Sequence, residues 1–77
     1  MKQVKVLGPG CPRCRQLAEN VQQAVGELDT PCEVEKVTDI GKMSAYGVLV
    51  TPALVVDGKV LSAGKVLGPE EIKELLA

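Results

Sequence analysis

The segment from Gly8 to Cys14, with sequence GPGCPRC, strongly limits how this chain can fold. Before it, QVKVL (residues 3–7) is short and rich in valine, which predicts a strand that ends at Gly-Pro-Gly. After it, Pro12 suits the first position of a helix, where no backbone N–H is needed. Apolar residues then recur at helical spacing: Leu17, Val21, Val25 and Leu28. The chain therefore begins with a strand, a tight turn and an amphipathic helix that ends near Gly26 or Asp29, and two cysteines lie at the junction.

The middle of the chain predicts a second strand and a short helix. CEVEKV (32–37) alternates, and its two glutamates on one face indicate a strand partly open to solvent. Thr38 or Asp39 can cap a helix over residues 40–46, which Gly47 would close. A strand, a helix and another strand in this order imply a parallel pair with a right-handed crossover.

The last third predicts a hairpin and a final helix. In ALVVDGKVLSAG, Asp57-Gly58 is the signal of a type I′ turn between two strands. GPEEIKELLA reads as a helix with acidic residues in its first turn and an apolar face of Ile72, Leu75 and Leu76. The order β-α-β-α-β-β-α predicts an α/β fold: a four-stranded mixed sheet flanked by helices on both faces.

Length and composition exclude several classes of protein. The 77 residues suit a single domain over residues 1–77, and one Tyr with no Phe or Trp requires an aliphatic core. The net charge is −1 and no basic stripe is present, so we expect no nucleic-acid partner. No apolar run approaches the roughly 20 residues of a membrane span, and the first residues, MKQVKV, lack the long apolar region of a signal peptide. We expect a cytoplasmic monomer that does not bind membranes.

The cysteine count narrows the chemistry. Three cysteines cannot all pair within one chain, which argues against a secreted disulfide scaffold. The chain has no histidine, so Cys–His and Ser–His–Asp catalysis and the commonest metal ligand are excluded. A structural zinc site would need four ligands, which three cysteines do not supply, so we expect no such metal.

Cys11 and Cys14 could form a redox couple, bind a metal or pack as small apolar residues. At the N-cap of a helix, the Cys11 sulfur would meet the positive end of the helix dipole, with Arg13 and Arg15 nearby. These charges favour the thiolate, which is the attacking species. Cys14, one turn into the helix, is placed to attack a resulting mixed disulfide. A C-x-x-C pair can also bind zinc or Cu(I), so the spacing alone does not decide.

A second signal is Thr51-Pro52, immediately before an apolar strand. Proline there cannot donate to the sheet and keeps Thr51 extended. It is either a proline at a strand edge or a cis-proline, which would turn the Thr51 backbone toward the end of the sheet.

Together, CPRC after the first strand, YGVLVTPALVVDGKV and a C-terminal helix resemble the thioredoxin fold over nearly the whole chain. The chain is most similar to the small thioredoxin-like (glutaredoxin-like) redox-active disulfide proteins of archaea and bacteria. The resemblance implies a dithiol–disulfide oxidoreductase in which Cys11 is the nucleophile and Cys14 resolves the mixed disulfide. It further implies that Pro52 is a cis-proline packed against the Cys11–Cys14 disulfide, and that Thr51 offers backbone groups to an extended partner segment. Pro12 resembles the proline that follows the nucleophile in glutaredoxins.

The chain departs from the family pattern at several positions. Gly10 stands where thioredoxins have Trp, and Arg13 fills the usual Tyr position of glutaredoxins. Lys5 occupies the position of the buried acid of thioredoxins, and we expect it to point outward. Gly64 could permit a close approach near the active-site end. The remaining cysteine, Cys32, matches no family role, and Tyr46 is expected in packing.

The resemblance also implies partners. These are disulfide-containing proteins, with a thioredoxin-reductase-like flavoprotein or a low-molecular-weight thiol as reductant, and no bound cofactor beyond the Cys11–Cys14 disulfide. The alternative is a small Cu(I)-chaperone-like module that uses the same C-x-x-C pair. Those modules resemble β-α-β-β-α-β and carry Met two residues before the first Cys, where this chain has Pro9.

Overall fold

The computed structural model describes residues 2–10, 12–29, 31–48 and 50–76. Seven elements follow one another in the predicted order: β1 (Lys2–Leu7), α1 (Pro12–Glu27), β2 (Cys32–Val37), α2 (Ile40–Ala45), β3 (Ala53–Val56), β4 (Lys59–Ala63) and α3 (Pro69–Leu76). None of the helices in these residues is long and apolar enough to cross a membrane.

The four strands form one mixed sheet in the order β2-β1-β3-β4. β1 runs parallel to β2 and antiparallel to β3, and β3 pairs antiparallel with β4. In this register Leu7 lies opposite both Val37 and Ala53, and Ala53 lies opposite Ala63. The residues that follow β1, β2 and β4 and precede β3 therefore meet at one end of the sheet.

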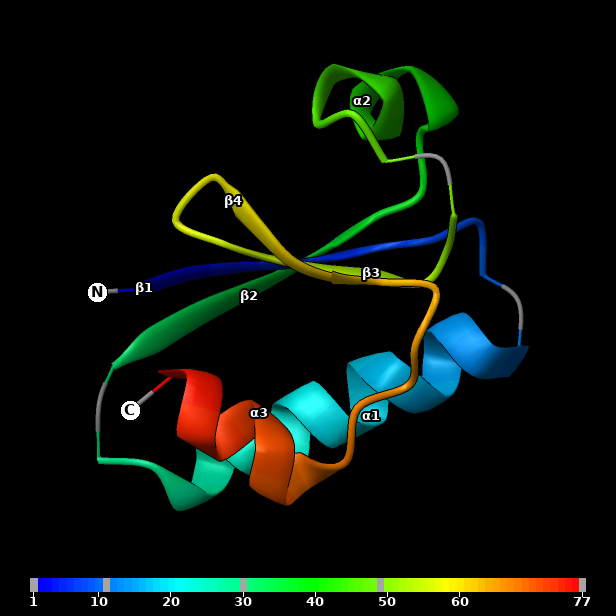
Figure 1. Ribbon diagram of the computed structural model, residues 1–77. Helices are drawn as coiled ribbons and strands as arrows, with labels where there is room; N and C mark the ends of the chain where they lie inside the picture. Colours follow the sequence, from blue (N-terminus) through cyan, green and yellow to red (C-terminus); the bar gives the residue numbers. More distant parts are fainter. Residues whose placement is uncertain (1, 11, 30, 49, 77) are drawn as a thin grey trace.

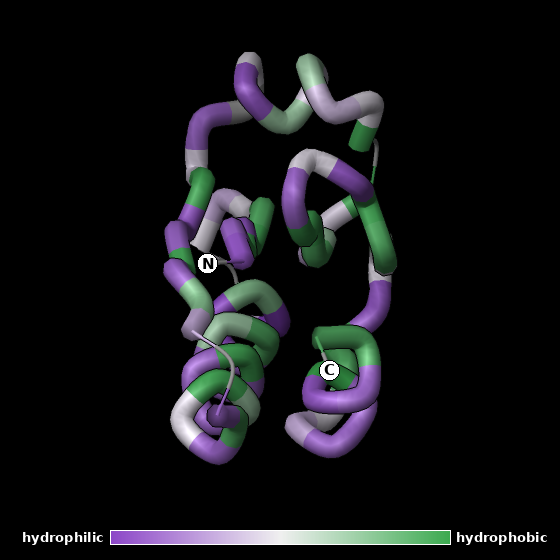
Figure 2. Tube along the Cα trace, turned by 90° about the vertical axis from the view of Figure 1, so that its left-hand side faces the viewer, coloured by the Kyte–Doolittle hydropathy of each residue, from purple (hydrophilic) through white to green (hydrophobic). Residues whose placement is uncertain are grey.

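The helices cover both faces of the sheet, as predicted. In Figures 1 and 2, α2 lies above the sheet, and α1 and α3 lie side by side below it. One core lies between the sheet and helices α1 and α3, and alternate strand residues point into it: Val4, Val6, Leu54 and Val56. A second, smaller cluster lies under α2: Leu7, Val37, Met43, Val48, Ala53 and Val55. The sheet thus buries both faces with aliphatic side chains, and this supports the thioredoxin fold.

The predicted helix cap and turn have local causes. Asp39 is the N-cap of α2, and its carboxylate accepts hydrogen bonds from the backbone N–H groups of Gly41 and Lys42. Asp57 and Gly58 both have positive φ (51° and 82°), as a type I′ turn requires.

The structure differs from two details of the prediction. Helix α2 ends at Ala45, with Tyr46 as its C-cap. Leu75 is 43% exposed, whereas Ile72 and Leu76 are buried. The prediction for Leu75 was wrong because α3 is short and only one narrow side of it faces the core.

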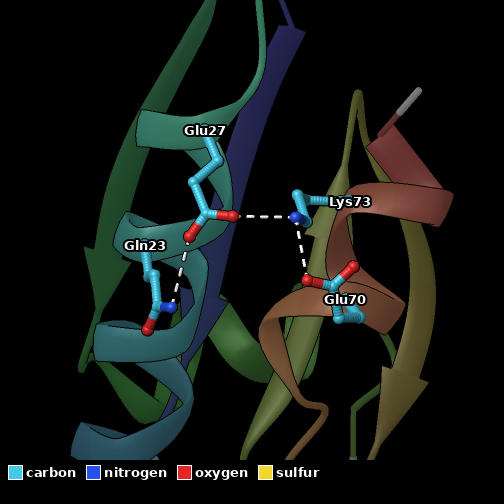
Figure 3. A network of polar contacts seen from close by, with 4 residues as sticks. All are labelled: Gln23, Glu27, Glu70 and Lys73. Carbon is cyan, nitrogen blue, oxygen red and sulfur yellow. Dashed lines mark hydrogen bonds and ion pairs between the residues drawn. The ribbon is translucent and has the colours of Figure 1, made fainter.

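Helices α1 and α3 are joined at their outer surface by a charged contact (Figure 3). The Lys73 ammonium lies 2.7 Å from Glu27 on α1 and 2.9 Å from Glu70 on its own helix. Gln23 donates a further hydrogen bond to Glu27. The hydrogen bond from Lys73, followed by that from Gln23, lowers the pKa of Glu27, and the hydrogen bond to Glu27 raises the pKa of Lys73.

We expect Lys73→Met to lower the melting temperature slightly at pH 7, because it keeps the aliphatic stem and removes the charge. The loss should disappear as the pH falls below the depressed pKa of Glu27, since a neutral carboxyl no longer gains from the ammonium. Thermal unfolding of both proteins between pH 2 and pH 7 measures this. Lys59→Met, a matched change on the exposed hairpin, should show no such pH dependence. A constant difference between wild type and Lys73→Met at every pH would contradict the assignment.

Candidate active site

The sequence signals converge at the end of the sheet where β1 and β2 finish. Pro12 and Arg13 begin α1 there, and Thr51-Pro52 leads into β3. The Thr51–Pro52 peptide bond is cis, as one of the two interpretations of the sequence predicted. Pro52 is buried and Thr51 is half-buried. Cys11, the predicted nucleophile, lies outside the described residues.

Cys14 is held in the first turn of α1, against the end of β1. It is 4% exposed. Its side chain fits against Gly8, where an added Cβ would overlap the Cys14 Sγ and lie 2.8 Å from its Cβ. Gly8 is itself fixed to the neighbouring strand, because its N–H donates to the Val37 carbonyl over 2.9 Å. The missing side chain of Gly8 therefore sets how closely Cys14 approaches the sheet.

Arg13 connects the start of α1 with the loop that follows β4. Its Nη2 donates to the Gly64 carbonyl over 2.8 Å, and the Gly64 N–H donates to the Pro52 carbonyl, also over 2.8 Å. Gly64 has φ +78°, and an added Cβ would lie 2.7 Å from Cγ1 of Val50. This is the close approach expected of Gly64. Arg13, Pro52 and Gly64 thus form one connected rim, with Val50 beside it and 57% exposed.

Lys5 lies on the other face of the sheet from Cys14. Its neighbours along the strand, Val4 and Val6, point toward α1, so alternation turns Lys5 toward α2. There its Nζ donates to the Tyr46 hydroxyl over 2.9 Å and lies 5.6 Å from the ring centre. This hydrogen bond raises the pKa of Lys5. The side chain points away from the site, as expected, but it is half-buried and covered by Tyr46 rather than fully solvated.

A small pocket of about 40 Å³ opens beside Cys14. It is lined by Cys14, Arg15, Lys36 and Thr38, and the surface that faces the pocket is almost wholly apolar. The rest of its wall is apolar or backbone: Val6, Gly8, Gly10 and Ala18. Among the described residues, no group of three or more histidine, cysteine or acidic side chains is arranged to hold a metal ion.

Sequence reasoning did not identify Gly8, Val50 and Lys36 as parts of this region. Gly8 could have been noticed as the first residue of Gly-Pro-Gly, directly before the cysteine pair. Val50 stands directly before Thr-Pro and ahead of β3. An apolar residue at that place in the sequence was a signal of an exposed apolar side chain. Lys36 had no signal of its own. Cys32 is half-buried against the core at the start of β2.

Comparison with known proteins agrees with this geometry. The family model for the thioredoxin domain matches residues 2–77. A thioredoxin of Methanocaldococcus jannaschii is 42% identical over 73 residues, which cover 95% of this chain and 84% of that protein. A thioredoxin of Methanothermobacter thermautotrophicus is 35% identical over 77 residues, the full length of both. The chain belongs to the thioredoxin-domain family of small redox proteins.

Proposed function

We propose that this protein is a thiol–disulfide oxidoreductase that uses Cys11 and Cys14 as its dithiol. The observation that carries the proposal is the placement of Cys14, buried in the first turn of α1 at the sheet end where the rim of Arg13, Pro52 and Gly64 lies. Family membership and the names of the two relatives support the general activity.

In the proposed mechanism, the Cys11 thiolate attacks one sulfur of a partner disulfide. A Cys11–partner disulfide forms and the other partner sulfur leaves as a thiolate. The Cys14 thiolate then attacks the Cys11 sulfur, which releases the second partner thiolate and forms the Cys11–Cys14 disulfide. Two electrons pass to the partner, and its two thiolates take up protons.

The start of α1 suits the first step. The first turn of this 16-residue helix presents backbone N–H groups that have no partner within the helix, and it lies at the positive end of the helix dipole. The first turn contains no acidic residue, while Arg13 and Arg15 add positive charge. Such surroundings stabilise a thiolate.

The rim would receive the partner. Thr51 is half-exposed beside Pro52 and would offer its backbone to an extended segment, next to the exposed Val50. We propose proteins with disulfides as substrates. The oxidised dithiol would be reduced again by a thioredoxin-reductase-like flavoprotein or a low-molecular-weight thiol, without a bound cofactor.

A Cu(I)-binding module is the alternative that the C-x-x-C motif left open. The structure does not favour this alternative, because α2 separates β2 from β3. In the β-α-β-β-α-β order of the Cu(I)-chaperone-like modules, the second strand is followed directly by the third. The thioredoxin relatives do not support it either.

The thiol–disulfide equilibrium tests the proposal. The purified protein is equilibrated in dithiothreitol buffers of graded potential, and alkylated thiols are counted by intact mass. We expect two thiols to disappear together, at Cys11 and Cys14, with a midpoint between about −180 and −270 mV. If oxidation produces no disulfide between them, the proposed function is wrong, and Cu(I) binding becomes the next assay.

A further inference from the structure

Charged residues are unevenly distributed between the two ends of this molecule. Four cations lie at the end of the sheet where α1 begins, and we call this set the cationic end: Arg13, Arg15, Lys36 and Lys65. The two arginines belong to the first turn of α1. Lys36 is the last residue but one of β2, and Lys65 follows β4 by two residues. Cations from three separate segments therefore gather around the end that carries Cys14.

The charge of the cationic end is directed to solvent. All four of its residues are exposed. The Arg13 guanidinium is fixed on the Gly64 carbonyl, directly before Lys65 in the chain. Arg15 and Lys36 line the pocket beside Cys14, but the surface that faces this pocket is almost wholly apolar. Long cationic side chains cover apolar surface with their stems and keep their charged heads in water. These charges therefore act on a molecule that approaches from solution.

Acidic side chains do not neutralise this end. Within the described residues, the ion pairs closer than 4.0 Å are those of Lys73 with Glu27 and Glu70. Asp39, which follows β2, accepts hydrogen bonds from the first N–H groups of α2, and Lys42 in the same helix offsets its charge. The cationic end therefore keeps its full positive charge.

The acids lie mainly over the rest of the molecule. Helix α3 carries three glutamates and lies beside the far half of α1, because Lys73 on α3 contacts Glu27 at the last residue of α1 (Figure 1). Outside the cationic end and the pair of Asp39 and Lys42, the chain has nine acids and four other cations. The net charge of −1 therefore divides into +4 at the cationic end and −5 over the remainder.

This separation of charge matters for encounter with a partner. Charges of one sign that are gathered at one end steer an oppositely charged surface toward that end and raise its association rate. The partner disulfide has to reach Cys11, which precedes α1 at this end. The thiolate that the proposed mechanism needs removes one positive charge and leaves the end positive.

We propose that the cationic end selects polypeptide substrates whose disulfide is flanked by acidic residues. It acts by accelerating their encounter with the dithiol in the productive orientation. The overall charge of −1 would favour basic partners instead, so the preference comes from where the charges lie. This inference rests on the proposed function, because it names the class of substrate for the same dithiol.

Three peptides of equal length, each closed by one disulfide, provide the test. They differ only in three flanking residues, which are Glu, Gln or Lys. The reduced protein is mixed with each peptide at pH 7, and the second-order rate constant of reduction is measured by acid quench and mass analysis. Dithiothreitol alone is the reference, because a small thiolate is negative and reacts slowest with the Glu peptide.

We expect the wild-type protein to reduce the Glu peptide about tenfold faster than the Lys peptide at 10 mM salt, the lower range of electrostatic steering. The ratio should approach one at 1 M salt, where charges are screened beyond about 3 Å. Lys36→Gln/Lys65→Gln should lower the low-salt ratio to about threefold, since half of the steering charge remains. It leaves both arginines of the first turn of α1 unchanged.

Lys2→Gln/Lys59→Gln is the matched control. It also removes two positive charges, but these lie at the starts of β1 and β4, at the opposite end of the sheet. This variant should keep the wild-type ratio. Thermal unfolding confirms that both double variants are folded.

The outcomes separate the inference from the proposed function. Reduction of all three peptides with a ratio of one, or with a preference for Lys, overturns the inference and leaves the proposed function intact. Equal loss of the preference in both double variants also overturns it, since net charge rather than the cationic end would then be responsible. Equal slowing of the Gln and Glu peptides in Lys36→Gln/Lys65→Gln overturns it as well, because the chemistry would have changed. If wild type reduces none of the peptides, the proposed function itself fails.

Discussion

Cys11→Ser will lower the rate of disulfide reduction to that of the uncatalysed reaction, and Cys14→Ser will instead leave the protein covalently attached to its partner. The reason is the order of the two steps. Without Cys11 no thiolate at the start of α1 attacks the partner, and a serine hydroxyl is not nucleophilic at neutral pH. Without Cys14 the first step still occurs, but nothing within the chain resolves the Cys11–partner disulfide.

Intact mass spectrometry after incubation with a disulfide-containing protein distinguishes the two variants. The Cys14→Ser adduct should carry the mass of one partner chain and be released by dithiothreitol. Cys32→Ser is the matched control, since it removes the third cysteine, at the start of β2, and should leave reduction unchanged. Activity in Cys11→Ser, together with an adduct formed by that variant, would reverse the two assigned roles.

Gly8→Ala is expected to destabilise the protein by about 1–3 kcal/mol, the usual cost of overpacking. The added methyl group would overlap the Cys14 sulfur, and Gly8 cannot retreat because its N–H is bonded to Val37. The clash alone is responsible, since Gly8 is not among the glycines with positive φ. For a domain of this size, the melting temperature should fall by roughly 4–8 °C for each kcal/mol.

The same variant should slow the second step of the reaction more than the first. Displacing Cys14 disturbs its approach to the Cys11 sulfur, so mixed disulfides should persist longer than in wild type. Rapid acid quench followed by mass analysis measures this lifetime.

Gly26→Ala is the matched control for Gly8→Ala, because it adds the same methyl group near the end of α1, where no atom beyond the chain neighbours and the nearby helix backbone lies within 4 Å. It should stabilise the helix by up to about 1 kcal/mol. If Gly8→Ala were as stable as wild type with unchanged kinetics, the close contact with Cys14 would have no functional importance.

Much of the fold could be predicted from local patterns. The two periodicities of the apolar residues, the Asp57-Gly58 turn and the cap at Asp39 each depend on neighbours within a few residues. Local sterics and hydrogen bonding dominate at such positions, and the predicted elements match the observed ones closely. The prediction for Leu75 failed because the burial of a short helix depends on how far its face reaches over the core.

The cysteine pair and the proline were also visible in the sequence, because a C-x-x-C motif and a proline before an apolar run are local features. That Cys14 and Pro52 lie at the same end of the sheet follows from the strand order β2-β1-β3-β4, which no local pattern specifies. Strand order is decided by which apolar faces bury each other best, and that is a property of the whole chain.

The sequence by itself determined the elements, the aliphatic core and the chemistry available at the start of α1. Only the tertiary structure placed Lys36 beside Arg15 and Cys14, brought Gly8 against the Cys14 sulfur and turned Lys5 toward Tyr46. These contacts join residues far apart in the chain or on opposite sides of a turn. Their distances are set by strand register and helix packing, whereas the sequence pattern reports only on the spacing of near neighbours.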